Sequence, residues 1–123
     1  MGSRKIILAD DKSDRLAHTT ARLRNAGYEV FPTSSATDAA SRATAKPADL
    51  LITNYTLRES SGVELCQGLR HDARTAGLPA ILVAAPGYAL GSSIPASAGI
   101  QRILSHESDL LSAVNELFHR HAA

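Results

Sequence analysis

Two carboxylates and one amide stand where short apolar runs of the chain end. Asp10 and Asp11 follow the run at residues 5–9, and Asn54 follows the run at 50–53. Neighbouring carboxylates can hold Mg²⁺, and an anionic carboxylate is the nucleophile that accepts a phosphoryl group. An amide carries no charge and cannot form an acyl phosphate. We therefore expect no phosphoryl transfer to Asn54.

Short β-type runs alternate with helical patterns, and these elements must position the polar residues. Apolar, β-branched runs predict strands at residues 5–9, 28–32, 50–53, 80–84 and 100–104. A further helix is expected inside residues 87–98. The other helices are expected to begin at Ser13, Ser35, Gly62 and Ser108. The three serines are assigned as N-caps, and Gly27 as the left-handed residue after the first helix.

This alternation predicts an α/β fold with a parallel sheet, because right-handed crossovers place helices on both of its faces. In such sheets ligands bind at the carboxyl ends of the strands, where Asp10, Asp11 and Asn54 stand. The 123 residues suit one domain, which we assign to residues 4–121. Residues 1–3 carry no pattern and are set aside as a disordered or non-native start.

The charge balance argues against several classes of partner. With 13 basic and 12 acidic residues and a formal net charge of +1, the chain lacks the positive excess that drives binding to nucleic acid or acidic lipid. The single Cys66 cannot close an internal disulfide, and no apolar signal segment begins the chain. We expect a cytoplasmic protein that binds neither nucleic acid nor a membrane. Cys66 lies on an apolar stripe and is expected in the core rather than as a nucleophile.

The residues at the strand ends make the chain resemble the CheY-like receiver domain of bacterial response regulators, from Lys5 to about His119. The sequence ILADD at 7–11 is similar to the first-strand motif, whose acidic pair holds magnesium in that family. PADLLITN at 47–54 is similar to the third-strand motif, and Gly62 matches the glycine after the active-site loop. The resemblance implies a flavodoxin-like, doubly wound five-stranded sheet of order 2-1-3-4-5 with five helices, the fourth short or irregular.

The chain departs from the family at the residues that carry its chemistry. Counted from Asp49, the phospho-acceptor aspartate falls on Asn54, the fourth-strand hydroxyl on Ala84 and the fifth-strand lysine on His106. The aromatic switch position of the fifth strand falls on Ile103. A receiver needs the acceptor carboxylate, a divalent cation and the lysine to take up a phosphoryl group. The resemblance therefore implies a degenerate variant, a pseudo-receiver.

We predict that the domain is not an enzyme and acts in two-component phosphorelay signalling as a phosphorylation-independent protein interaction module. No cofactor is expected, although Asp10 and Asp11 leave weak Mg²⁺ binding open. The same two acids could instead cap the first helix or pair with a nearby Arg or Lys. His106 keeps an alternative open, in which a small ligand, a metal or unconventional phosphorylation controls the altered pocket.

A stretch without charge predicts the contact surface. No charged residue occurs from Thr75 to Gln101, and the expected fourth helix would present Tyr88, Leu90 and Ile94 on an uncharged face. Such patches commonly mark protein contacts. We expect a histidine kinase, a regulator, an output domain or a second copy of the chain to bind the face formed by the fourth helix, fifth strand and last helix. The alternative is a poorly formed segment without a partner, because Pro95 and the serines are weak helix formers.

Overall fold

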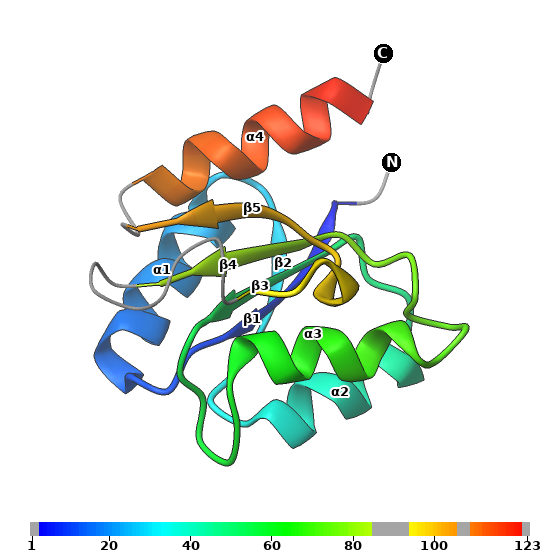
Figure 1. The fold of residues 1–123 in the computed structure, drawn as a ribbon. Helices are drawn as coiled ribbons and strands as arrows, with labels where there is room; N and C mark the ends of the chain where they lie inside the picture. Colours follow the sequence, from blue (N-terminus) through cyan, green and yellow to red (C-terminus); the bar gives the residue numbers. More distant parts are fainter. Residues whose placement is uncertain (1–2, 85–93, 106–108, 122–123) are drawn as a thin grey trace.

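Five parallel strands form one sheet in the order β2-β1-β3-β4-β5 (Figure 1). The strands are β1 (Lys5–Ala9), β2 (Glu29–Thr33), β3 (Leu50–Asn54), β4 (Ala80–Val83) and β5 (Ile100–Leu104). The helices are α1 (Ser13–Asn25), α2 (Ala36–Ala45), α3 (Gly62–Arg70) and α4 (Leu110–His121), with a short 3-10 helix η1 (Ala96–Ala98). The computed structural model describes residues 3–84, 94–105 and 109–121, with residues 120 and 121 described by their backbone only. The predicted flavodoxin-like sheet and its strand order are confirmed.

Helices cover both faces of the sheet and divide the core into two layers (Figure 1). α2 and α3 pack on the face that carries Ile7 and Leu51, and α1 and α4 pack on the face that carries Ile6 and Ile52. Successive side chains of a strand point to opposite faces, so β1 and β3 supply both layers. Being buried on both sides, these strands appear in the sequence as continuous apolar runs.

The predicted helix ends are confirmed at α2 and wrong at one end of α1. Ser35 caps α2, since its hydroxyl oxygen accepts the Asp38 N–H at 3.2 Å, and Gly27 has the expected left-handed backbone with φ of 100°. Ser13 is the first helical residue rather than the cap. Lys12 holds the cap position without a side-chain hydrogen bond, because its ammonium group can only donate. The Asp10 carboxylate accepts the Lys12 N–H at 3.0 Å. Ser108 lies outside the described residues.

The described residues contain four α-helices where the resemblance implied five. Most of the expected fourth helix falls on residues 85–93, which the structure does not describe, and η1 is the helical turn seen in the rest of that span. Small differences of one residue also occur at β2, β3 and β4, as in Asn54, which closes β3 rather than following it. No helix among the described residues is long and apolar enough to span a bilayer.

Candidate functional site

The carboxyl ends of β1 and β3 bring Asp10 and Asn54 to the same edge of the sheet. Ala9 of β1 lies opposite Thr53 of β3. Asp10 and Asn54 are the residues that directly follow this pair along the chain. Asp10 is buried, whereas Asp11 faces outward and is exposed. Asp10 and Asn54 therefore lie together at the strand ends, and Asp11 lies at the exposed margin beside them.

The Arg15 side chain, from the first turns of α1, lies at the centre of this cluster. Its Nε and Nη2 atoms donate to the two carboxylate oxygens of Asp10 at 2.6 and 2.7 Å. Nη2 also lies 3.8 Å from Oδ1 of Asp11. Two parallel charge-assisted bonds between a guanidinium and a carboxylate form a strong and directional pair. Of the interpretations left open for the two acids, the structure bears out pairing with an arginine.

The Asn54 amide adds a third contact to this guanidinium. Its orientation follows from its neighbours, because the Val83 carbonyl only accepts hydrogen bonds and the guanidinium only donates them. The amide nitrogen donates to the Val83 carbonyl oxygen at 3.1 Å, and the amide oxygen accepts from Arg15 Nη2 and from the Thr56 hydroxyl, both at 3.1 Å. Arg15 thus joins the ends of β1 and β3 through hydrogen bonds.

Little space remains between these side chains. The cavity lined by Asp10, Arg15 and Asn54 has a volume of about 20 Å³, room for about one water molecule and not for a phosphoryl group. Within the part of the chain that the structure describes, no three His, Cys, Asp or Glu side chains gather as a metal site. The chemistry of the donor set agrees, since a cationic guanidinium stands where a divalent ion would need free carboxylate oxygens.

Gly62, the first residue of α3, lies directly against the end of β3. A Cβ atom at this position would lie 2.8 Å from the Thr53 hydroxyl oxygen and even closer to the Asn54 carbonyl oxygen. The Gly62 N–H donates to the Tyr55 carbonyl oxygen at 2.7 Å. Glycine is therefore required where α3 begins, because any side chain there would push the end of β3 aside.

The other predicted site residues lie apart from this cluster or outside the description. Ala84 is fully buried directly after β4, and its N–H donates to the Leu104 carbonyl oxygen at 2.8 Å. Ile103 on β5 is 40% exposed, which makes it one of two exposed large apolar residues among those described. Ile94 is half-buried and packs against the layer of core under α2 and α3. His106, Tyr88 and Leu90 lie outside the described residues.

Cys66 lies in the core under α3, as the sequence predicts. Its side chain is fully buried, and this burial raises the pKa of the thiol to about 11, with a small opposing effect from the charge of Arg70. A thiol with this pKa stays protonated at neutral pH, and the thiol form is a poor nucleophile. Cys66 therefore contributes packing rather than chemistry.

The model of the response regulator receiver domain matches residues 6–114. The chain belongs to this family. The receiver domain is similar in structure to the chemotaxis protein CheY4 of Vibrio cholerae, with 18% identity and a TM-score of 0.84 over 94% of this chain and 98% of that one. It is also similar to the receiver domain of the sensor histidine kinase PA1611 of Pseudomonas aeruginosa PAO1, with 19% identity and a TM-score of 0.82 over 94% and 97% of the two chains.

Both solved structures show the fold that this receiver domain shares. The second was obtained with a magnesium ion coordinated in its active site cleft. A curated relative is the phosphate regulon transcriptional regulatory protein PhoB of Pseudomonas aeruginosa, 28% identical over 87 residues. That alignment covers 71% of this chain and only 38% of PhoB. The family as a whole works in two-component signalling, where receiver domains interact with histidine kinases and output domains.

Proposed function

We propose that this receiver domain is a pseudo-receiver, a protein interaction module of a cytoplasmic two-component pathway that takes up no phosphoryl group and catalyses no reaction. The observation that carries the proposal is the closed strand-end cluster. Arg15 binds both oxygens of Asp10 and also contacts the Asn54 amide. An uncharged amide thus stands where the family has its acceptor carboxylate, and a guanidinium fills the space in front of it.

A divalent cation would have to displace Arg15 to reach Asp10. Hydrogen bonds that involve charged groups contribute about 1.5–3 kcal/mol each, and Arg15 makes two of them to Asp10. If the guanidinium stayed in place, a divalent ion about 4 Å away would be repelled by roughly 8 kcal/mol at an effective dielectric constant of about 20. We therefore expect the acidic pair to bind Mg²⁺ poorly, in contrast to an open receiver pocket.

Control of the pocket by a small ligand, a metal or unconventional phosphorylation has less support. A cavity of about 20 Å³ does not admit such a group while Arg15 is in place.

The proposed contact face includes β5, an edge strand of the sheet. Ile103 on this strand is 40% exposed, and the preceding segment from Thr75 to Gln101 has no charged residue. A long uncharged segment of this kind commonly marks a protein contact. The proposed partners are a histidine kinase, another regulator, an output domain or a second copy of the chain, each bound through β5 and the helices beside it.

The test is a titration of the ¹⁵N-labelled domain with Mg²⁺, alone and with beryllofluoride, followed by NMR. The native chain and the variant Asn54→Asp should show no saturable change at Asp10, Asp11 or position 54, because Arg15 still pairs with the acids. The double variant Asn54→Asp/Arg15→Ala should bind Mg²⁺, because three carboxylates then face an open pocket.

The matched control is Asn54→Asp/Arg58→Ala, which removes the same charge from an exposed loop residue. It should behave like Asn54→Asp alone. A stoichiometric beryllofluoride complex of the native chain, or a covalent adduct after incubation with acetyl phosphate, would contradict the proposal.

A further inference from the structure

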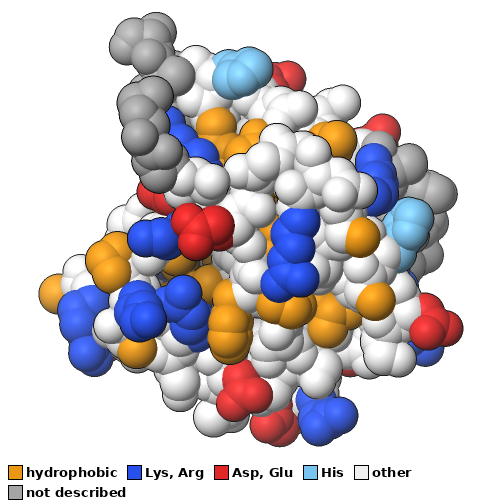
Figure 2. Space-filling view, turned by 180° about the vertical axis from the view of Figure 1, so that it is seen from behind, with side chains coloured by type: hydrophobic (Ala, Val, Ile, Leu, Met, Phe, Trp, Pro, Cys, Tyr) orange, Lys and Arg blue, Asp and Glu red, His pale blue; other side chains and the backbone are white. Residues whose placement is uncertain are grey.

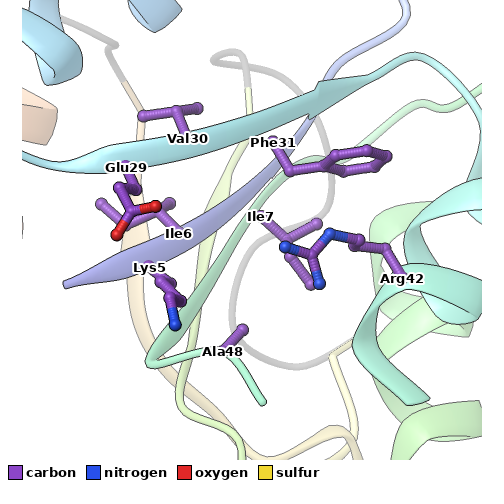
Figure 3. Close-up of a pocket in the computed structure, with 8 residues that line it drawn as sticks. All are labelled: Lys5, Ile6, Ile7, Glu29, Val30, Phe31, Arg42 and Ala48. Carbon is purple, nitrogen blue, oxygen red and sulfur yellow. The ribbon is translucent and has the colours of Figure 1, made fainter. Parts of the chain in front are cut away.

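A second pocket opens at the other end of the sheet, where β1 and β2 begin. It lies on the face covered by α2, beneath the Arg42 side chain of that helix (Figure 3). Its volume is about 120 Å³, room for roughly four water molecules at about 30 Å³ each. The pocket is lined by Lys5, Ile6, Ile7, Glu29, Val30, Phe31, Arg42 and Ala48. None of these residues belongs to the Asp10 cluster.

The guanidinium of Arg42 has a hydrogen-bonding atom without a partner. Its Nη1 is buried and makes no hydrogen bond. Its Cζ lies 5.2 Å from the centre of the Phe31 ring, and Figure 3 shows the guanidinium between this ring and Ile7, pointing into the open space above Ala48. The aromatic contact holds the cation in place at the wall of the pocket. Buried donors are normally satisfied, so an unsatisfied one in a native fold needs a reason.

Two exposed charged residues, Lys5 and Glu29, stand at the open end of the pocket (Figure 3). The Lys5 ammonium adds a second positive charge to that of Arg42. Figure 2, which views the molecule from behind, shows several basic side chains next to apolar ones on that face. Glu29 opposes this positive charge at the entrance.

The outer edge of β2 cannot pair with an added strand, and this excludes an extended peptide as the ligand. Pro32 has no N–H to offer, and the Val30 carbonyl already accepts a hydrogen bond from Arg24 Nη2 at 3.0 Å. An edge blocked in this way does not pair with an extended peptide. A group small enough to enter the pocket therefore fits better than a peptide backbone.

We propose that this pocket binds a small oxyanion, a carboxylate or phosphate group of about four or five heavy atoms, between Arg42 and Lys5. A guanidinium presents paired N–H donors that match the oxygens of such groups. Ile7 and the Phe31 ring would contact the apolar part of a carboxylate ligand. The proposal does not depend on the function of the Asp10 cluster, because the two sites share no residue.

The experiment is an NMR titration of the ¹⁵N-labelled chain with inorganic phosphate, acetate and N-acetyl-aspartate amide, at constant pH and ionic strength. Phosphate and acetate should shift the backbone amides of Phe31, Arg42 and Ala48, and the Arg42 Nε–Hε signal, in a saturable way. If the blocked aspartate binds at least as tightly as acetate, the oxyanion belongs to a partner's acidic side chain. If it binds more weakly, the ligand is a free small anion, and both results support the site.

Three variants sharpen the test. Arg42→Met should weaken binding at least about tenfold, because a charge-assisted hydrogen bond is lost. Glu29→Gln should strengthen it about two- to fivefold by removing an opposing exposed charge. Arg58→Met changes the net charge as Arg42→Met does, from an exposed loop, and should leave binding unchanged. Absence of saturable shifts in the native chain, or equal weakening by Arg58→Met and Arg42→Met, would overturn the proposal.

Discussion

Two arginines from different helices reach opposite ends of the same sheet and meet opposite conditions. Arg15 at the carboxyl end binds both oxygens of Asp10, whereas Arg42 at the amino end keeps a buried Nη1 without a partner. The cavity at the first end has a volume of about 20 Å³ and is lined by the bound counter-ion Asp10. The pocket at the second end has a volume of about 120 Å³, and its acidic lining residue is the exposed Glu29 at the entrance. A residue type thus does not reveal whether its charge supports the fold. The partner that the fold supplies decides that.

The two arginines also differ in what they contribute, since one stabilises the fold and the other is available to a ligand. A satisfied buried ion pair leaves no atom for a ligand, and breaking it is costly because one charge stays buried alone. An unsatisfied guanidinium adds little to the stability of the folded chain, but it is already positioned to bind an anion. The same substitution at the two arginines should therefore have different effects on the free energy of unfolding.

The largest effect is expected for Arg15→Met. This change leaves the buried Asp10 carboxylate with the Lys12 N–H as its remaining described donor, and it should lower the free energy of unfolding by about 2–3 kcal/mol. The value is below that for a fully buried pair because the Arg15 side chain is 32% exposed. Denaturant unfolding measures it. The double variant Asp10→Asn/Arg15→Met should recover most of the loss, and a loss below about 0.5 kcal/mol in the single variant would show that the pair is not structural.

A smaller effect is expected from two glycines of α3, which test how tightly the carboxyl end is packed. Gly62→Ala should lower the free energy of unfolding by about 1–3 kcal/mol, because its Cβ would lie 2.8 and 2.9 Å from Thr53 side-chain atoms. Gly68→Ala is the matched control, since its Cβ meets nothing within 4 Å. It should raise the free energy of unfolding by about 0.5–1 kcal/mol through helix propensity alone. Thermal unfolding of the two variants should shift in opposite directions, and a shared direction would contradict the packing described.

The smallest effect is expected for Arg42→Met. The change removes a contact with the Phe31 ring worth about 0.5–1 kcal/mol, and it also relieves the unpartnered Nη1, so the net change should stay below about 1 kcal/mol. Denaturant unfolding in a chloride buffer without phosphate or carboxylate is the measurement. A loss as large as that of Arg15→Met would show that Arg42 already has a counter-ion within the chain.

Local patterns were enough to predict the fold and the place of the site. The central strands are buried on both faces and appear as uninterrupted apolar runs, and parallel pairing necessarily brings their carboxyl ends together. Asp10 and Asn54 were therefore found from the ends of two runs. The cap at Ser13 was predicted wrongly because the sequence could not show that Asp10 already accepts the Lys12 N–H at 3.0 Å.

The sequence missed Arg15 as a site residue for a related reason. Along α1 it is one of several basic residues, and a solvated helix face was an adequate explanation for all of them. Its position four residues after Asp11 was the available signal, since that spacing suits an ion pair. Its principal partner is nevertheless Asp10, and this pairing depends on the angle at which α1 leaves the end of β1.

By itself the sequence determined the parallel sheet with helices on both faces and the polar residues at its strand ends, because these follow from hydrophobic periodicity and from residue identity at single positions. Only the tertiary structure decided which charges are paired. Arg42 meets Phe31 because α2 packs across β2, and Arg15 meets Asn54 because β1 and β3 are neighbours in the sheet. These two contacts join segments that lie far apart along the chain, and no local pattern encodes the distances between such segments.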